Sequence, residues 1–390
     1  MYSTSRVQER PCAGSFESLE TKQYSDKAIA FHNYIGTNNN IRFVIALWNR
    51  TFAAQVTYST GTGPHSVVAA DVNGDSKLDL IVANSGSRNV GILLNNGDGT
   101  FATQITYSTG SVPISVGAPD VNGDNNPDIV VANQASDTVS VLLNNGNGTF
   151  ATQVTYSTGS SPYSLVAADV NGDSKLDIIV ANLVSNNVGV FLNNGDGTFA
   201  TQVTYSAGNY PISVAAADVN GDRKLDIIVV NGNSRNVGVF LNNGNGTFAT
   251  QVTYSTGTSP QSVVAADVNG DTKLDIIVAN YVSNNVGVFL NNGDGTFATQ
   301  VTYSTGTYPQ SVIAADVNRD SKLDLIVANS GSDSVSVFLN IGNGMFATQV
   351  TYSTGSLPYS VAAVDVNGDR KLDIIVTNVN SNNVGILLAV

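Results

Sequence analysis

Residues 71–79 read DVNGDSKLD, and this stretch or a close variant occurs seven times at intervals of 49 residues. The copies begin at Asp71, Asp120, Asp169, Asp218, Asp267, Asp316 and Asp365. A second marker, the phenylalanine of GTFATQVTYS, returns at the same spacing from Phe52 to Phe346. Repeats of about 40–50 residues are typical of β-propeller blades. The spacing therefore predicts seven equal units over residues 50–390.

Each unit contains four short apolar segments separated by turns rich in Gly, Asn, Asp and Ser. In the first complete unit we expect strands A to D at residues 66–72, 78–84, 90–94 and 100–108. Strand B is apolar on both faces, whereas strand D alternates apolar and polar residues, as a half-exposed outer strand does. No window has helical periodicity. The pattern predicts an all-β, seven-bladed β-propeller of four-stranded repeats.

The array opens with a D-type strand at residues 51–59 and closes with an A, B, C set at 360–366, 372–378 and 384–388. If the N-terminal strand D pairs with the last strand C, the ring closes and two unpaired sheet edges disappear. Residues 1–49 form a separate segment of unknown structure. Within it, residues 41–47 (IRFVIAL) align with the strand C position and indicate a remnant strand.

Oxygen-bearing side chains occupy positions 1, 3, 5 and 9 of each DVNGDSKLD loop, between strands A and B. This spacing can wrap a short loop around one hard cation, and Ca²⁺ takes six to eight oxygen ligands. A plain Asx-rich hairpin turn is the alternative for any single copy, but seven copies in register favour a metal site. The predicted metal ligands are Asp71, Asn73, Asp75, Asp79, Asp120, Asn122, Asp124, Asp128, Asp169, Asn171, Asp173, Asp177, Asp218, Asn220, Asp222, Asp226, Asp267, Asn269, Asp271, Asp275, Asp316, Asn318, Asp320, Asp324, Asp365, Asn367, Asp369 and Asp373.

The charge balance agrees with bound cations and disagrees with a nucleic-acid partner. Asp and Glu number 30 against 17 Lys and Arg, a net charge of −13, whereas a nucleic-acid binder needs a basic face. All three Glu lie in the first twenty residues, so the acidic residues of the array are all Asp. Seven divalent cations would make the array nearly neutral. Cys12 is the single cysteine, and His32 and His65 are the only histidines, which leaves little for zinc.

The repeated D-x-N-x-D-x-x-x-D followed by an apolar strand resembles the FG-GAP/VCBS repeat family, whose members include the integrin α-subunit propeller. The resemblance covers about residues 51–390. It implies a propeller with up to seven Ca²⁺ ions in the A–B loops, an extracellular setting, and protein or glycan ligands. The family usually has Gly at loop position 6, where this chain has Ser, Asn, Arg or Thr. A positive φ at a non-Gly residue costs about 1–2 kcal/mol, so we expect weak sites, with Kd on the order of 10⁻⁴–10⁻³ M.

The seven copies differ mainly in the D–A connections and the B–C loops, which lie on one face of an antiparallel blade. The A–B loops lie on the opposite face and barely vary. Either the variable face binds a partner or its loops have simply drifted. The candidate ligand-binding residues there are His65, Tyr163, Tyr210, Gln261, Tyr281, Tyr308, Gln310 and Tyr359.

Three classes of function remain open. The first is a binding or cell-adhesion module that recognises a protein or glycan through the D–A/B–C loop face. The second is a polysaccharide-acting enzyme, which we disfavour because Asp137 and Asp333 lie four blades apart and do not form the carboxylate pair of a glycosidase. The third is a purely structural scaffold.

The expected setting is extracellular or secreted, because cytosolic Ca²⁺ is too low to fill weak sites. Residues 1–16 show no apolar core of the signal-peptide type. No run of 18 apolar residues occurs, so we expect no membrane span. We expect a monomer.

Overall fold

The computed structural model describes residues 21–24, 27–30 and 52–390. The chain divides into two compact units, Met1–Thr51 and Phe52–Val390. In the first unit, β1 (Thr21–Tyr24) and β2 (Lys27–Ala30) form an antiparallel pair. The predicted remnant strand at residues 41–47 lies outside the described residues. The described residues form no helix, and therefore none long and apolar enough to cross a membrane.

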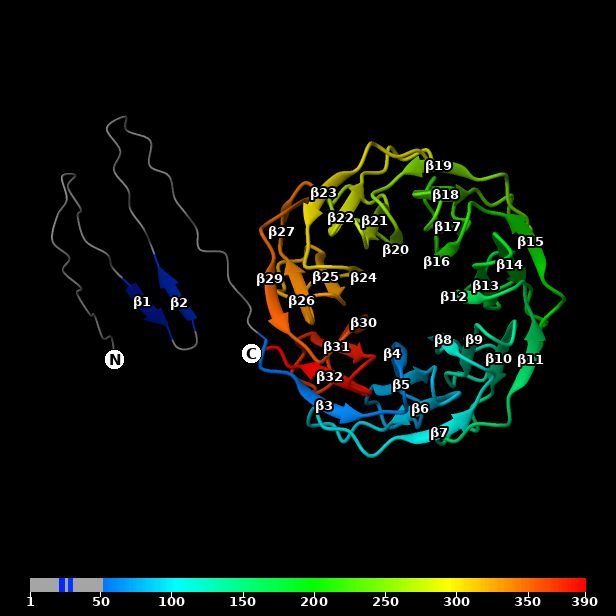
Figure 1. Cartoon of the computed structure of the whole chain (residues 1–390), viewed down its shortest axis with the longest axis horizontal. Coiled ribbons are helices and arrows are strands. Elements are labelled where there is room, and N and C mark those ends of the chain that lie inside the picture. The colour runs from blue at the N-terminus through cyan, green and yellow to red at the C-terminus, as the bar shows by residue number, and fades with distance from the viewer. Residues whose placement is uncertain (1–20, 25–26, 31–51) are drawn as a thin grey trace. The chain divides into compact units, whose positions relative to one another are not determined.

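The second unit is a closed ring of seven four-stranded antiparallel sheets (Figure 1). The innermost A strands are β4 (Pro64–Ala70), β8 (Pro113–Gly117), β12 (Pro162–Ala168), β16 (Pro211–Ala217), β20 (Pro260–Ala266), β24 (Pro309–Ala315) and β30 (Pro358–Val364). The B strands are β5 (Asp79–Asn84), β9 (Ile129–Asn133), β13 (Asp177–Asn182), β17 (Asp226–Asn231), β21 (Asp275–Asn280), β25 (Asp324–Asn329) and β31 (Asp373–Asn378).

The C strands are β6 (Asn89–Leu93), β10 (Thr138–Leu142), β14 (Asn187–Phe191), β18 (Asn236–Phe240), β22 (Asn285–Phe289), β26 (Ser334–Phe338) and β32 (Asn383–Leu387). The outer D strands are β3 (Val56–Ser59), β7 (Ile105–Ser108), β11 (Val154–Ser157), β15 (Val203–Ser206), β19 (Val252–Ser255), β23 (Val301–Ser304) and β29 (Val350–Ser353). A small extra hairpin, β27 (Asn340–Gly342) with β28 (Met345–Phe346), lies between β26 and β29. We number the blades 1 to 7 in the order of their A strands.

The predicted closure of the ring is confirmed. β3 pairs antiparallel with β32, from Val56 opposite Ile386 to Ser59 opposite Asn383, and completes blade 7. Phe52 adds an isolated bridge to Ala389 beyond the strands. The first and last strands of the propeller therefore belong to one sheet, and the edge of β32 is covered.

The D strands are shorter than the nine residues we predicted. In blade 1 the regular strand covers only Ile105–Ser108, because Phe101 turns into the core and forms an isolated bridge with Asn95. Within this strand, Ile105 is about half exposed, whereas Tyr107 packs inward. The apolar residue that follows Gln in each copy therefore contributes little to the core.

The hydrophobic core is divided into seven layers, each between two neighbouring blades. In the first layer, Ile81 and Ile92 of blade 1 pack with Ile129 and Val131 of blade 2. All six residues of strand β5 are buried, which matches its apolar character on both faces. Burying a side chain of this size contributes about 1.5–3 kcal/mol. The blades are therefore held mainly by their neighbours.

An aromatic pair joins each D strand to the next blade. The ring of Tyr58 in blade 7 meets the edge of Phe101 in blade 1 at a centroid distance of 5.4 Å, and the Tyr58 hydroxyl donates to the Gly99 carbonyl. Equivalent Tyr–Phe pairs occur at the other six junctions, up to Phe52 with Tyr352. The tyrosines of VTYS therefore pack the outer part of the junctions between blades.

Candidate functional site

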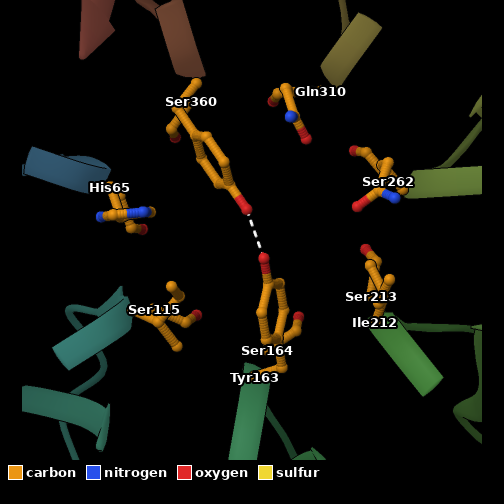
Figure 2. A pocket seen from close by; sticks show the side chains of 14 residues that line it. His65, Ser115, Tyr163, Ser164, Ile212, Ser213, Ser262, Gln310 and Ser360 are labelled. Carbon is orange, nitrogen blue, oxygen red and sulfur yellow. Dashed lines mark hydrogen bonds between the residues drawn. The ribbon is translucent and has the colours of Figure 1, made fainter. Parts of the chain in front are cut away.

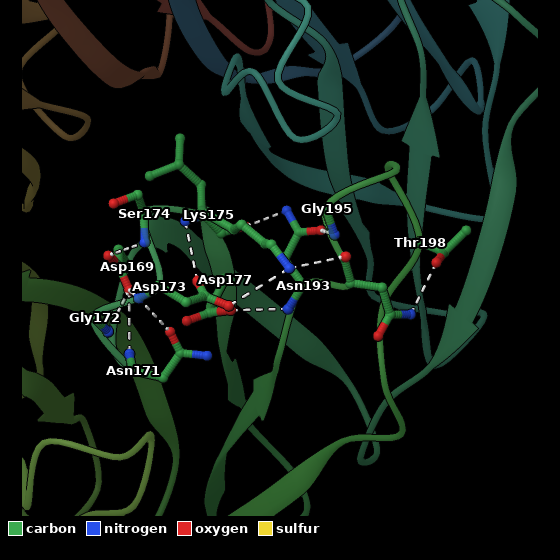
Figure 3. A network of polar contacts seen from close by, with 12 residues as sticks. Asp169, Asn171, Gly172, Asp173, Ser174, Lys175, Asp177, Asn193, Gly195 and Thr198 are labelled. Carbon is green, nitrogen blue, oxygen red and sulfur yellow. Dashed lines mark hydrogen bonds and ion pairs between the residues drawn. The ribbon is translucent and has the colours of Figure 1, made fainter.

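One face of the propeller carries the seven A–B loops, and their carboxylates are tied to the loop's own backbone. In blade 3 (Figure 3), Asp169 Oδ1 accepts the N–H groups of Gly172 and Asp173 at 2.7 and 3.2 Å, and Oδ2 accepts that of Ser174 at 2.8 Å. Asn171 Oδ1 accepts the Asp173 N–H at 3.0 Å. Short carboxylate and amide side chains form such turns readily. The backbone of the loop therefore curls around the side chains at positions 1 and 3.

The Asp at position 9 is a buried structural bridge. Asp177 is fully buried, and its two oxygens accept the N–H groups of Val170 at 3.0 Å and Asn193 at 2.8 Å. Asn193 belongs to the C–D turn and also donates to the Val121 carbonyl of the preceding blade at 2.9 Å. Burial raises the pKa of the Asp177 carboxyl, and the charge of Asp173 adds to the effect. This residue links its A–B loop to a C–D turn and, through Asn193, to blade 2.

Several features of the loops bear on whether they fit a cation. The donor set of carboxylate and amide oxygens is the chemistry that Ca²⁺ prefers. Position 5 of six loops instead faces a lysine, as in Asp173 with Lys175 at 3.7 Å, and the spread across the six pairs is 3.3–4.0 Å. Across residues 52–390 and the two short N-terminal strands, no group of three or more His, Cys, Asp or Glu side chains is placed to hold a metal ion. Calcium therefore stays a prediction from the donor set.

Loop position 6 adopts the left-handed conformation in all seven copies, with φ between 64° and 69°. Thr272, which is β-branched, has the largest value of 69°. Position 4 is also left-handed, and in blade 6 it holds Arg319, whose guanidinium donates to the Arg370 carbonyl of the next loop. Left-handed backbone is costly for residues other than glycine. The loops thus keep a sharp turn that their sequence does not favour.

The opposite face carries the D–A connections and the B–C loops, which hydrogen-bond to each other. In blade 1 the N–H groups of Ser85 and Gly86 donate to the carbonyls of Gly63 and Thr62, both at 2.9 Å. We call this the loop face. The residue before the proline of every A strand has a positive φ, and only blade 1 has glycine there. The others are Val112, Ser161, Tyr210, Ser259, Tyr308 and Leu357, with φ between 54° and 61°.

An Asx side chain of the preceding blade holds five of these strained residues. The Oδ1 atoms of Asn382, Asp137, Asn186, Asn284 and Asp333 accept the N–H groups of Gly63, Ser161, Tyr210, Tyr308 and Leu357 at 2.7–2.9 Å. Arg88 and Arg235 occupy the equivalent position in the other two blades. The carboxylates of Asp137 and Asp333 therefore serve the joints between blades.

A pocket of about 110 Å³ lies where the A strands converge on the loop face (Figure 2). Five of the eight predicted ligand-binding residues line it: His65, Tyr163, Gln261, Gln310 and Tyr359. We call it the axial pocket. Each of these residues directly follows the proline that begins an A strand. The structure thus gathers into one cavity residues that the sequence spreads over five blades.

Two tyrosines meet across the axial pocket. The hydroxyls of Tyr163 in blade 3 and Tyr359 in blade 7 are hydrogen-bonded to each other (Figure 2). The His65 ring lies edge-on to Tyr359 at a centroid distance of 4.7 Å, and its Nδ1 lies 3.0 Å from the Gly63 carbonyl oxygen. Burial lowers the pKa of His65 and raises the pKa of both tyrosines. All three side chains are therefore uncharged at neutral pH.

The other three predicted ligand-binding residues do not line the axial pocket. Tyr281 and Tyr308 stack on each other with ring centroids 4.6 Å apart and an interplanar angle of 15°. Tyr308 and Tyr210 are 41% and 43% exposed, and both belong to the strained positions before proline. These three tyrosines form what we call the loop rim, which is distinct from the pocket.

Nine further residues line the pocket that the sequence analysis did not single out. Two are apolar, Ile114 and Ile212, at the position of His65. The others are a serine from each blade, which we call the serine ring: Ser66, Ser115, Ser164, Ser213, Ser262, Ser311 and Ser360. A Pro-x-Ser triplet, present in all seven D–A connections, was the available signal.

Comparisons with known proteins agree with this architecture. The FG-GAP-like repeat profile matches residues 33–82, 71–131, 120–180, 169–229, 218–278, 267–327 and 317–376. No curated protein sequence matches the chain.

Solved structures resemble the chain in fold. BBS1N, crystallised in complex with ARL6DN, has 12% identity and a TM-score of 0.63, over 87% of this chain and 96% of its own. An Agrocybe aegerita lectin that recognises non-reducing terminal N-acetylglucosamine has 22% identity and a TM-score of 0.56, over 78% and 91%. Virginiamycin B lyase from Staphylococcus aureus has 12% identity and a TM-score of 0.62, over 87% and 100%. At these identities the likeness shows the fold alone.

Proposed function

Because the chain belongs to the FG-GAP-like repeat family, we propose that it is a calcium-stabilised binding module that recognises a protein or glycan through its loop face. The family's propeller scaffold supports a binding or protein-interaction role. Among proteins of similar fold, BBS1N is found in a protein complex and the Agrocybe aegerita lectin recognises a sugar. The proposal extends these two kinds of partner to this chain.

The contrast between the two faces carries the proposal. Seven nearly identical blades keep the A–B loops constant, while the D–A and B–C loops change from copy to copy. The loop face nevertheless retains strained backbone at six of the seven D–A connections, including the bulky Tyr210 and Tyr308. Strained positions persist only where the surroundings hold them, and they cluster at functional sites. Exposed tyrosines supply both apolar contact area and a hydrogen bond to a partner.

The proposal includes a setting and an assembly state. Weak calcium sites fill at millimolar Ca²⁺, which favours an extracellular or secreted protein and a role in adhesion. We propose that the protein is a monomer. We also propose a non-enzymatic role, because the loop-face carboxylates Asp137 and Asp333 each accept a backbone N–H. A catalytic pair would need two carboxylates about 5–10 Å apart around one substrate bond.

Binding measurements with matched variants test the proposal. The full chain in 2 mM Ca²⁺, on the order of an extracellular concentration, is screened against a glycan array and a library of purified extracellular proteins. Tyr308→Ala should lower the affinity for the partner at least roughly tenfold, because an aromatic anchor is lost.

The control is Asp196→Asn in a C–D turn of the opposite face. Blades 2 and 4 already carry Asn147 and Asn245 at the equivalent position, so this change is tolerated by the scaffold. It should leave binding unchanged. Equal binding by both variants, or a loss caused only by Asp196→Asn, would remove the loop face as the recognition surface.

A further inference from the structure

The axial pocket is lined by side chains that carry no charge. Its fourteen lining residues comprise seven serines, two tyrosines, two glutamines, two isoleucines and His65. His65 is neutral because burial lowers its pKa below the usual range. A charged ligand would lose its hydration here without gaining an opposite charge, which is strongly unfavourable.

The serine ring supplies hydroxyls in fixed orientations. Ser66 Oγ accepts the N–H of Val116 in the next blade at 3.3 Å. The same bond recurs for four more members of the ring, at 3.2–3.3 Å. An oxygen that accepts in this way can still donate its own proton to a ligand. Five of the seven serines therefore hold a hydroxyl oxygen in place and keep its proton available to a ligand.

The variable positions of the pocket divide into a polar part and an apolar part. Gln261 and Gln310 each offer a donor and an acceptor, as do the hydroxyls of Tyr163 and Tyr359. Ile114 and Ile212 contribute apolar surface on the A strands of blades 2 and 4. A ligand that matches this lining must carry many neutral hydrogen-bonding groups and some C–H surface. Sugars combine these two properties.

We propose that the axial pocket binds an uncharged, polyhydroxylated ligand, namely a neutral sugar residue. This inference rests on the proposed binding function and specifies its glycan branch. Ligand pockets for drug-sized molecules usually measure about 300–1,000 Å³, whereas this pocket measures about 110 Å³. Tyr163 and Tyr359 meet across this pocket. The two rings must move apart to admit a whole sugar, and the ligand's hydroxyls then replace the bond between them.

The first measurement is the melting temperature of the full chain, in Ca²⁺, with methyl glycosides of glucose, galactose, mannose and N-acetylglucosamine at about 100 mM. A ligand that binds only the folded state raises the melting temperature. We expect at least one neutral glycoside to do so and to bind in calorimetry. Glucuronate and glucosamine, which are charged, should bind at least roughly tenfold more weakly because the pocket offers no counter-charge.

The second measurement uses the double variant Gln261→Ile/Gln310→Ile. Ile114 and Ile212 already occupy the equivalent position in blades 2 and 4, so the variant should fold with an unchanged melting temperature. It should lower the affinity for the neutral glycoside by roughly tenfold or more, because two hydrogen-bonding groups are lost. Tyr308→Ala, on the loop rim, should not change the affinity for the free glycoside.

The outcomes separate this inference from the proposed function. If a glycoside binds equally well to the double variant but less well to Tyr308→Ala, the sugar sits on the loop rim and the axial site is wrong. If no neutral glycoside binds but a protein partner is lost with Tyr308→Ala, the axial inference fails and the proposed function stands. If neither sugars nor proteins bind, both fail. Tighter binding of glucuronate than of neutral sugars also overturns the axial inference.

Discussion

The two faces of the propeller are built at opposite ends of the same strands, but their polar side chains hydrogen-bond to the backbone in different ways. On the face of the A–B loops, Asp169 and Asp177 direct their oxygens to the backbone, and the sequence hardly changes between copies. On the loop face, an Asx side chain holds the backbone at five of the seven joints, and the residue that it holds can be Tyr, Leu or Ser. The backbone frame is thus fixed by few bonds, so that other side chains can vary without loss of the fold.

Both faces contain backbone positions in the left-handed conformation, but different types of residue occupy them. The left-handed positions of the A–B loops hold small or polar residues such as Ser76 and Asn125, apart from three arginines. Those of the loop face include Val112, Tyr210, Tyr308 and Leu357, which tolerate this conformation poorly. The comparison indicates that the residues at left-handed positions of the A–B loops suit the turn itself. On the loop face, the bulky residues at such positions are not those that a left-handed backbone favours.

The largest expected effect is that of Ca²⁺ on stability. A site with a Kd of ~10⁻⁴–10⁻³ M stabilises the fold by roughly 1.4–2.7 kcal/mol at about 10 mM Ca²⁺, and seven sites by roughly 10 kcal/mol or more. Thermal unfolding in Ca²⁺ and in EGTA measures the difference, with Mg²⁺ as the control. The Tyr308→Ala variant should show the same shift. No shift would mean that the loops are only hairpin turns, and an equal shift in Mg²⁺ would contradict a preference for Ca²⁺.

The next effect compares single carboxylates of the two faces in EGTA. Asp177→Ala should lower the free energy of unfolding by about 3 kcal/mol, because two buried N–H groups lose their acceptor. Asp137→Ala should cost about 1 kcal/mol, because it removes one bond at an exposed loop. Urea unfolding measures both values. Equal losses would contradict the structural role of position 9.

A smaller effect comes from relieving strain. Thr272→Gly should stabilise the propeller by about 1 kcal/mol, since φ at this position is 69°. Tyr308→Gly relieves similar strain but loses the stack with Tyr281, which contributes about 0.5–1.5 kcal/mol, so its net effect should be near zero. Urea midpoints measure both. Partner binding should be retained by Thr272→Gly and lost in Tyr308→Gly. A lower stability of Thr272→Gly would show that position 6 is not strained.

The smallest effect is a pH dependence at the axial pocket. Because burial lowers the pKa of His65 below the ordinary histidine value of about 6.5, the folded state prefers the neutral ring. The stability that this preference provides is complete above pH 6.5 and falls as the pH drops through 6.5 toward the lower folded pKa. His65→Gln, which copies Gln261 and Gln310, should remove this part of the acid-induced loss. Unfolding curves at pH 7.5 and 5 for the two proteins provide the comparison, and parallel losses would contradict it.

Much of the fold could be predicted because the constant repeat length defines the number of blades and the order of their strands. The order of strands and the pairing of β3 with β32 followed from counting copies and noting the displaced D strand. The ends of strand D could not be read in the same way. Whether Phe101 continues a strand or turns into the core depends on the neighbouring blade, with which it packs in a shared cluster. Local alternation contains no information about that neighbour.

The candidate site was predictable only in part, for a related reason. Variable aromatic and amide residues drew attention to His65, Tyr163 and Tyr359, whereas the serines that begin the predicted A strands are the same in every copy and did not. Sevenfold repetition places identical residues around one axis. A serine that has no evident role in a single copy therefore belongs to a ring of seven serines in the complete propeller. Likewise, the second partner of Asp177 comes from the C–D turn, which the loop motif alone does not reveal.

The pairing of β3 with β32 also has a consequence for how the chain is made. Most contacts form within a blade or between successive blades, but Val56 meets Ile386 only when roughly 300 further residues exist. At a ribosome rate of about 5–20 residues per second, β3 waits on the order of 15–60 s for its partner. During that interval the strand Val56–Ser59 emerges with no sheet to join. The nascent protein therefore has a built-in delay, during which an unpaired β-segment needs protection from aggregation.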